Sequence, residues 1–243
     1  MTSKAPVAVA VGAGPGIGAG FVRRFAKGGY TVVIGRRNTD SAAELITEVE
    51  AAGGRAVAIN IDARSEDSVS ERFSEIEQDI GPIEVALYNA GANTNKPILD
   101  MPSDLFEKVW RLSCFGGFLM GREAARHMLP RGQGTILYTG ATASLRGGSG
   151  FSAFASAKFG LRAVAQSLAR ELGPKGIHVA HVIVDGGVDS AVIRERRSKS
   201  GLENPDGSLI DTYQIAEAYW MLHRQPRAAW THELDIRTSV EKW

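Results

Sequence analysis

Short apolar runs rich in β-branched residues alternate with helical patterns along the whole chain, and this alternation constrains the fold most. Strands joined by helical crossovers are parallel and covered on both faces. The pattern therefore predicts an α/β fold, a Rossmann doubly wound, mostly parallel sheet of about seven strands with helices on both faces. The expected strands span residues 6–11, 31–35, 56–60, 83–88, 135–140, 178–184 and 233–237.

The segments between these strands predict helices, with one exception. Ser41 and Glu44 form an S-x-x-E capping box that predicts a helix ending at the glycines 53–54. Long helices are expected over 103–128 and 150–173, and shorter ones elsewhere. Residues 186–211 are polar and contain Gly, Asn and Pro, which predicts a substrate-side loop or lid. Residues 1–243 are expected to form a single domain.

Composition excludes several function classes. The 243 residues carry a net charge of +1, so no electrostatic field favours nucleic acid or a membrane surface. No apolar run approaches the roughly 18 residues of a membrane span, and the N-terminal apolar run is too short for a signal peptide. Cys114 is the single cysteine, so no disulfide can form within the chain. We expect a cytoplasmic protein.

A glycine-rich turn follows the first expected strand and opens the first helix. Gly12, Gly16 and Gly18 fit the spacing G-x-x-x-G-x-G, with Gly14 between them. Backbone N–H groups and the positive end of a helix dipole favour an anion at such a turn. A tight turn without a ligand is the alternative, but the strand before and the helix after favour nucleotide binding.

The end of the second expected strand indicates which nucleotide binds. A carboxylate there would accept hydrogen bonds from the adenosine 2′-hydroxyl and repel a 2′-phosphate. The chain has Arg36 and Arg37 instead, and no carboxylate before Asp40. Guanidinium groups suit phosphate oxygens, so NADP(H) is favoured over NAD(H). Two solvated arginines are the alternative.

These features together resemble the short-chain dehydrogenase/reductase family over nearly the whole chain. The glycine turn, Asp62 after the third strand and Asn89-Ala90-Gly91 after the fourth carry the resemblance. It implies that Asp62 contacts adenine and that residues 89–91 line the cofactor. The cofactor-binding positions that it implies are Gly12, Gly14, Pro15, Gly16, Ile17, Gly18, Arg36, Arg37, Asp62, Ala63, Asn89, Ala90, Gly91, Lys158, Gly186 and Val188.

The resemblance also implies a catalytic tetrad of Asn, Ser, Tyr and Lys for hydride transfer between a nicotinamide and an alcohol or carbonyl carbon. In this chain the corresponding positions are Ser113, Ala141, Phe154 and Lys158, so only the lysine is retained. No tyrosine in the chain is followed four residues later by a lysine. Because a positioned acid or base contributes about 10²–10⁴ in rate, reaction by the usual route should be nearly silent.

Two functions therefore stay open: an oxidoreductase with a non-standard catalytic set, acting on a small carbonyl or alcohol compound, or a catalytically silent NADP(H)-binding sensor or partner protein. A cleft that binds no dinucleotide is the weakest alternative. Thr142 is the first candidate for a substitute hydroxyl, with a capping role as the alternative. Asp185 or Asp189 could supply an acid or base, with solvated carboxylates of a loop turn as the alternative. No histidine pair has metal-ligand spacing, so no metal is expected. The resemblance implies a homodimer or homotetramer formed through the two long helices.

Overall fold

The computed structural model describes residues 4–201, 203, 205 and 207–241. Seven parallel strands form one sheet in the order β3-β2-β1-β4-β5-β6-β7, as the alternating sequence pattern predicts. The strand order reverses between β1 and β4, which is the switch point where ligands bind in open α/β sheets. The strands are β1 (Val7–Val11), β2 (Thr31–Arg36), β3 (Arg55–Asn60), β4 (Ile83–Tyr88), β5 (Gly134–Ala141), β6 (Ile177–Asp185) and β7 (Glu233–Arg237).

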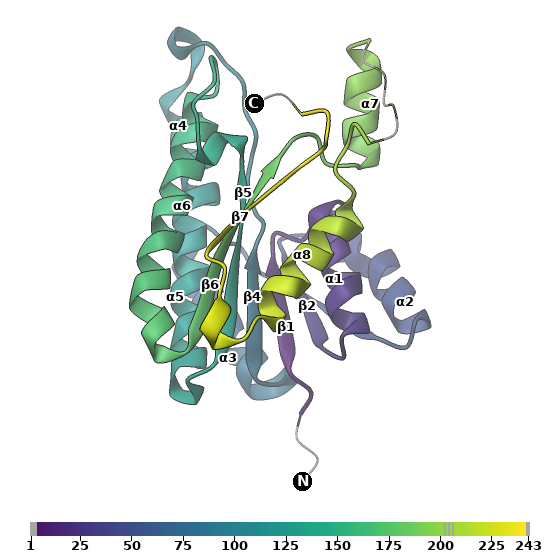
Figure 1. Cartoon of the computed structure of the whole chain (residues 1–243), viewed down its shortest axis with the longest axis vertical. Coiled ribbons are helices and arrows are strands. Elements are labelled where there is room, and N and C mark those ends of the chain that lie inside the picture. Colours follow the sequence, from purple (N-terminus) through teal and green to yellow (C-terminus); the bar gives the residue numbers. More distant parts are fainter. Residues whose placement is uncertain (1–3, 202, 204, 206, 242–243) are drawn as a thin grey trace.

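Helices cover both faces of this sheet (Figure 1). On one face lie α3 (Glu66–Glu75), α5 (Gly116–Met128) and α6 (Ser152–Leu172), and on the other lie α1 (Ile17–Lys27), α2 (Ala43–Ala51) and α8 (Thr212–Arg224). The further helices are α4 (Ser103–Trp110) and α7 (Ala191–Lys199). No helix of the described residues is long and apolar enough to cross a membrane.

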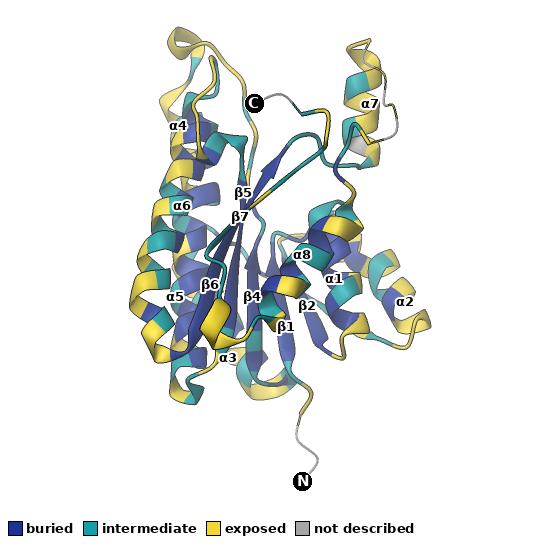
Figure 2. Ribbon diagram, viewed as in Figure 1, coloured by how far each residue is buried: buried dark blue, intermediate teal, exposed yellow. Residues whose placement is uncertain are grey.

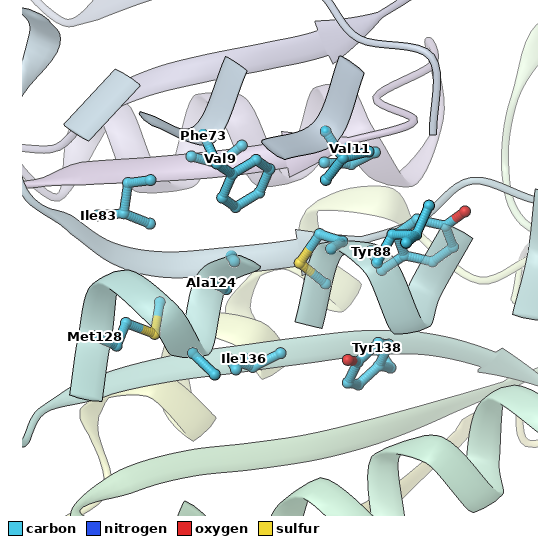
Figure 3. Close-up of a cluster of buried hydrophobic side chains, with 14 of the residues drawn as sticks. Val9, Val11, Phe73, Ile83, Tyr88, Ala124, Met128, Ile136 and Tyr138 are labelled. Carbon is cyan, nitrogen blue, oxygen red and sulfur yellow. The ribbon is translucent and has the colours of Figure 1, made fainter. Parts of the chain in front are cut away.

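Two hydrophobic clusters fill the space between the sheet and its helices. On the α5 and α6 face, Val9, Phe73, Tyr88, Ile136 and Tyr138 belong to one cluster, and all are fully buried (Figure 3). The second cluster lies on the α1 and α8 face. Figure 2 shows that the central strands are buried along most of their length, as expected for β-branched runs covered on both faces, while the outermost strands β3 and β7 are mostly of intermediate exposure.

Three boundary predictions were wrong in detail. The Ser41–Glu44 capping box does not form, because Asp40–Ala42 make a 3₁₀ turn and α2 begins only at Ala43. The expected helix over 103–128 is interrupted by a π turn, Arg111–Phe115, between α4 and α5. The expected loop over 186–211 contains the helix α7, whose first turn is capped by the Ser190 side chain.

Candidate functional site

The glycine turn brings the backbone of β1 close to the end of β4. Gly12 has a φ of +81°, and a Cβ atom there would lie 2.5 Å from the Cα atom of Ala90. Asn89 Nδ2 donates a hydrogen bond of 3.1 Å to the Gly12 carbonyl and so braces the turn. A Cβ atom at Gly14 would meet nothing within 4 Å. The turn is therefore fixed at Gly12 and open at Gly14, as a phosphate-binding turn requires.

A cleft of about 690 Å³ extends from this turn over the ends of β2 and β3. Its lining brings together most of the predicted cofactor-binding residues: Gly12, Gly14, Gly16, Ile17, Arg36, Arg37, Asp62, Ala63, Asn89, Ala90 and Gly91. Pro15 is exposed, and Gly18 is buried, where a Cβ atom would lie 2.4 Å from the Ala13 Cα atom. Neither residue belongs to the described lining, so Gly18 serves the close packing of the turn.

The charged residues of this cleft differ in how they are held. Arg36 donates to the Ser41 carbonyl at 3.3 Å, whereas the exposed Arg37 guanidinium makes no hydrogen bond or ion pair with any described residue. Asp62 accepts two hydrogen bonds from the Arg64 side chain, at 2.9 and 2.7 Å, and this guanidinium lowers the pKa of the Asp62 carboxyl. An adenine contact by Asp62 would therefore share the carboxylate with Arg64.

A second cleft of about 750 Å³ adjoins the first and shares Gly16, Ile17, Asn89 and Gly91 with it. It lies beyond the carboxyl ends of β5 and β6. The predicted site residues that line it are Ala141, Thr142, Phe154, Lys158, Gly186 and Val188. The structure thus brings most of the predicted cofactor and catalytic positions into two connected clefts.

Lys158 lies at the base of the second cleft. It is one helical turn after Phe154 in α6, and its Nζ atom lies 6.0 Å from the centroid of the phenyl ring. The Nζ atom donates a hydrogen bond of 2.7 Å to the Thr139 carbonyl, and the residue is only 5% exposed. Burial disfavours the charged amine and lowers the pKa of Lys158 to about 8.

Ser113 reaches the same region from the π turn between α4 and α5. Its Oγ atom is buried and has no hydrogen-bond partner among the described residues. A Cβ atom built on Gly91 would lie 3.4 Å from Ser113 Oγ and 3.6 Å from Lys158 Nζ. The two side chains therefore converge above Gly91. π turns often occur at functional sites because they redirect one side chain of a helix.

The remaining predicted candidates are engaged elsewhere. The Thr142 hydroxyl donates to the Asp185 carboxylate, which is 4% exposed and lies 3.3 Å from an Arg237 guanidinium nitrogen. Asp189 accepts hydrogen bonds from the Arg194 side chain. The hydroxyl proton of Thr142 therefore points to a carboxylate and away from a substrate, which argues against Thr142 as a substitute acid in this conformation.

A buried polar network beneath the second cleft was missed by sequence reasoning. Ser144 Oγ accepts a hydrogen bond from the Ala141 amide at 3.2 Å and lies 3.4 Å from His181 Nε2. His181 Nδ1 lies 3.1 Å from a Glu233 carboxylate oxygen, and Arg162 binds the same carboxylate at 2.6 and 2.7 Å. Burial lowers the pKa of His181 to about 4. The network fixes the backbone at Ala141 and is closed to substrate, because Ser144 and His181 are fully buried.

The described residues contain no group of three or more His, Cys, Asp or Glu side chains placed to hold a metal ion. His178, on β6, has structural partners. His178 stacks on Trp230 with a centroid distance of 4.9 Å, and its Nε2 atom hydrogen-bonds to the Thr231 carbonyl.

Comparison with known proteins defines the class to which this fold and site belong. The profile of the short chain dehydrogenase family matches residues 6–201, which is most of the chain. The protein therefore belongs to the short-chain dehydrogenase family of oxidoreductases.

Three relatives illustrate this membership. The crystal structure of a short-chain dehydrogenase from Rhodopseudomonas palustris is 50% identical, with a TM-score of 0.82, and the match covers 96% of this chain and 98% of that one. A 7α-hydroxysteroid dehydrogenase complexed with NADH and 7-oxo glycochenodeoxycholic acid is 27% identical, with a TM-score of 0.85, covering 96% and 92%. The 7α-hydroxysteroid dehydrogenase of Escherichia coli K12 is 29% identical over 227 residues, covering 92% and 88%.

Proposed function

We propose that this protein is an NADP(H)-binding oxidoreductase of the short-chain type with a non-standard catalytic set, acting on a small carbonyl or alcohol compound. One observation carries the proposal: two adjoining clefts meet at the glycine turn, with Arg36 and Arg37 at one end and Lys158 at the other. A dinucleotide spanning both clefts would place its adenosine end near the arginines and its nicotinamide end near Lys158.

The arginines favour the 2′-phosphate form of the cofactor. The Arg37 guanidinium makes no hydrogen bond or ion pair with a described residue, although its charge helps to lower the pKa of the Asp62 carboxyl, so a phosphate would not have to displace an existing ion pair. No carboxylate lies at the end of β2 to accept hydrogen bonds from a free 2′-hydroxyl. The relative bound to NADH supports a nicotinamide dinucleotide in general. The preference for NADP(H) rests on Arg36 and Arg37.

The chemical end of the cleft lacks the usual proton donor. Phe154 and Ala141 carry no hydroxyl, and Thr142 donates its proton to Asp185. Among the described lining residues, Lys158 is a titratable group whose pKa is shifted toward neutrality. Burial lowers this pKa to about 8. We infer that Lys158 holds the nicotinamide ribose, and that proton delivery to a substrate, where it occurs, depends on this ammonium group or on the substrate itself.

A catalytically silent NADP(H)-binding sensor or partner protein is the second candidate. The same missing hydroxyls favour it, since the remaining hydroxyls of the described lining, on Thr139, Thr142 and Ser190, already have hydrogen-bond partners. The surface of the protein is suited to self-association, because Trp110, Phe118 and Phe159, on α4, α5 and α6, are each about two fifths exposed. We propose a homodimer or homotetramer formed through these helices, with residues 186–211 as a substrate-side lid and a cytoplasmic location.

Fluorescence titration with NADPH and NADH tests the cofactor assignment. Wild type should bind NADPH at least about tenfold more tightly than NADH, because a charge-assisted phosphate contact contributes about 1.5–3 kcal/mol. The double variant Arg36→Ala/Arg37→Ala should lose this ratio, while Arg55→Ala, an exposed arginine at the start of β3, should keep it. Equal affinities in wild type, or a ratio unchanged in the double variant, would contradict the assignment.

Deuterium transfer separates the two candidate functions. NADPH labelled at C4 of the nicotinamide is incubated with the protein and a panel of ketones, and the products are analysed by mass spectrometry. Label in an alcohol product establishes an oxidoreductase. Tight NADPH binding without label transfer to any ketone identifies the silent binding protein.

A further inference from the structure

The second cleft has an unbalanced charge. The charged side chains among its described lining residues are Arg146 and Lys158, and no carboxylate is among them. Two carboxylates lie close to this lining: Asp185 is turned to Thr142 and Arg237, and Glu241 Oε2 would lie 3.3 Å from a Cβ atom built on Gly186. Once Lys158 holds a cofactor ribose, Arg146 remains as the cation that faces the substrate.

Arg146 itself is exposed and unpaired within the described structure. It follows the 3₁₀ turn Thr142–Ser144, and its backbone amide donates to the Thr142 carbonyl at 3.2 Å. Its guanidinium makes no hydrogen bond, ion pair or ring contact with any described residue. A guanidinium that no described acid neutralises offers a planar pair of donors to a carboxylate.

Apolar side chains make up much of the lining to which Arg146 belongs: Phe151 and Phe154 from the start of α6, and Val184, Val188 and Ile193 from the β6 and α7 side. Asn93, Thr139 and Ser190 add polar groups to it. Apolar walls reduce the local dielectric and strengthen a charge-assisted hydrogen bond relative to one in open water. They also favour a ligand with hydrocarbon surface next to its charged group.

We propose that the second cleft takes a carbonyl or alcohol compound that bears a carboxylate beside an apolar body, and that Arg146 recognises the carboxylate. The inference deepens the proposed function and rests on it, because Lys158 is assigned to the cofactor. A guanidinium fork can bind either a carboxylate or a phosphate, but one guanidinium balances the single charge of a carboxylate, whereas the described lining holds no second free cation for a phosphate dianion.

Isothermal titration of the NADP⁺ complex tests this proposal with matched acids and esters. The probes are 2-oxooctanoate and benzoylformate, each compared with its methyl ester, so that the keto group and the apolar body are kept while the charge is removed and one methyl group is added. Wild type should bind each acid about tenfold more tightly than its ester, a difference of about 1.4 kcal/mol. Arg146→Ala should remove the preference, Arg146→Lys should retain part of it, and the control Arg55→Ala should leave it unchanged.

The outcomes separate this proposal from the proposed function. NADP⁺ binding is measured first, without probe, and its absence would overturn both. Where NADP⁺ binds, three results would overturn the carboxylate proposal alone. They are equal affinity for acid and ester, no binding of either probe, and an acid preference that persists in Arg146→Ala. Loss of the preference at raised salt in wild type would agree with it, since the guanidinium is solvent-accessible.

Discussion

Restoring the two missing hydroxyls should convert this cleft into an efficient carbonyl reductase. In the variant Phe154→Tyr/Ala141→Ser, the new phenol would stand one helical turn from Lys158, whose Nζ atom already lies 6.0 Å from the ring centroid. The ammonium would favour ionisation of the phenol and tune it as an acid. The new serine would stand at the end of β5, where the Ser144 network already fixes the backbone.

The magnitude follows from the two groups added. A positioned general acid contributes about 10²–10⁴ in rate, and a hydroxyl donor to the developing oxyanion contributes roughly 10²–10³. Both act on the same substrate oxygen, so the gains are not additive. We expect kcat/KM for NADPH-dependent reduction to rise by about 10²–10⁴ over wild type, with most of the gain coming from the tyrosine.

The assay follows NADPH absorbance with benzoylformate and its methyl ester as substrates. Phe151→Tyr is the matched control, because it adds a phenol to the same cleft at a different place. The reasoning is refuted if the double variant folds, binds NADPH and still reduces no faster than Phe151→Tyr. The reasoning would also be refuted if wild type reduces the ketones rapidly and no variant that removes a candidate substitute hydroxyl abolishes this activity.

Three further predictions concern binding and stability. Lys158→Met should weaken NADPH binding about tenfold or more, yet raise the unfolding free energy of the free protein at pH 7 by about 3 kcal/mol, because the buried amine has its pKa lowered from 10.5 to about 8. Between pH 8 and pH 10.5 the unfolded wild-type chain binds more protons than the folded one, so wild type gains stability as pH rises. The difference in unfolding free energy between the variant and wild type, measured by urea unfolding, should therefore shrink over this range, and a constant difference would contradict the assignment. His181 acts on the acid side of neutrality: burial lowers its pKa to about 4, so its contribution to stability should fall as pH drops below 6.5, by roughly 2 kcal/mol at pH 5. His181→Gln should reduce the slope of stability against pH, and His223, whose pKa is also lowered to about 4, should supply a remaining slope; a slope unchanged in the variant would exclude His181 as a source. Gly12→Ala should lower the melting temperature, since it places a Cβ atom at φ +81° and 2.5 Å from the Cα atom of Ala90. Gly14→Ala should leave the melting temperature unchanged but weaken the binding of NADPH. Equal melting temperatures of the two variants would refute this interpretation of the turn.

The fold could be predicted because its strands are buried on both faces and appear as apolar runs. The π turn at Arg111–Phe115 could not, because one extra residue in a helical turn leaves no sequence pattern. The helix α7 escaped prediction because most of its residues are exposed, so it lacks the apolar stripe that identifies a helix.

The candidate site divides in the same way. The glycine turn and the Phe154–Lys158 spacing are local patterns and could be recognised in the sequence. The bond from Thr142 to Asp185 joins residues 43 positions apart, and the contact of His181 with Glu233 joins residues 52 apart. Such contacts depend on which strands become neighbours at the edge of the sheet, so spacing along the chain does not reveal them.

The most direct test of the account is a crystal structure of the complex with NADP⁺. We predict the 2′-phosphate within hydrogen-bond distance of Arg36 or Arg37, the pyrophosphate at Gly14, and the nicotinamide ribose on Lys158 Nζ. Beside Phe154 no protein hydroxyl should point to the substrate position. A cofactor absent from the glycine turn at saturating concentration, or Thr142 released from Asp185 and turned into the cleft, would contradict the account.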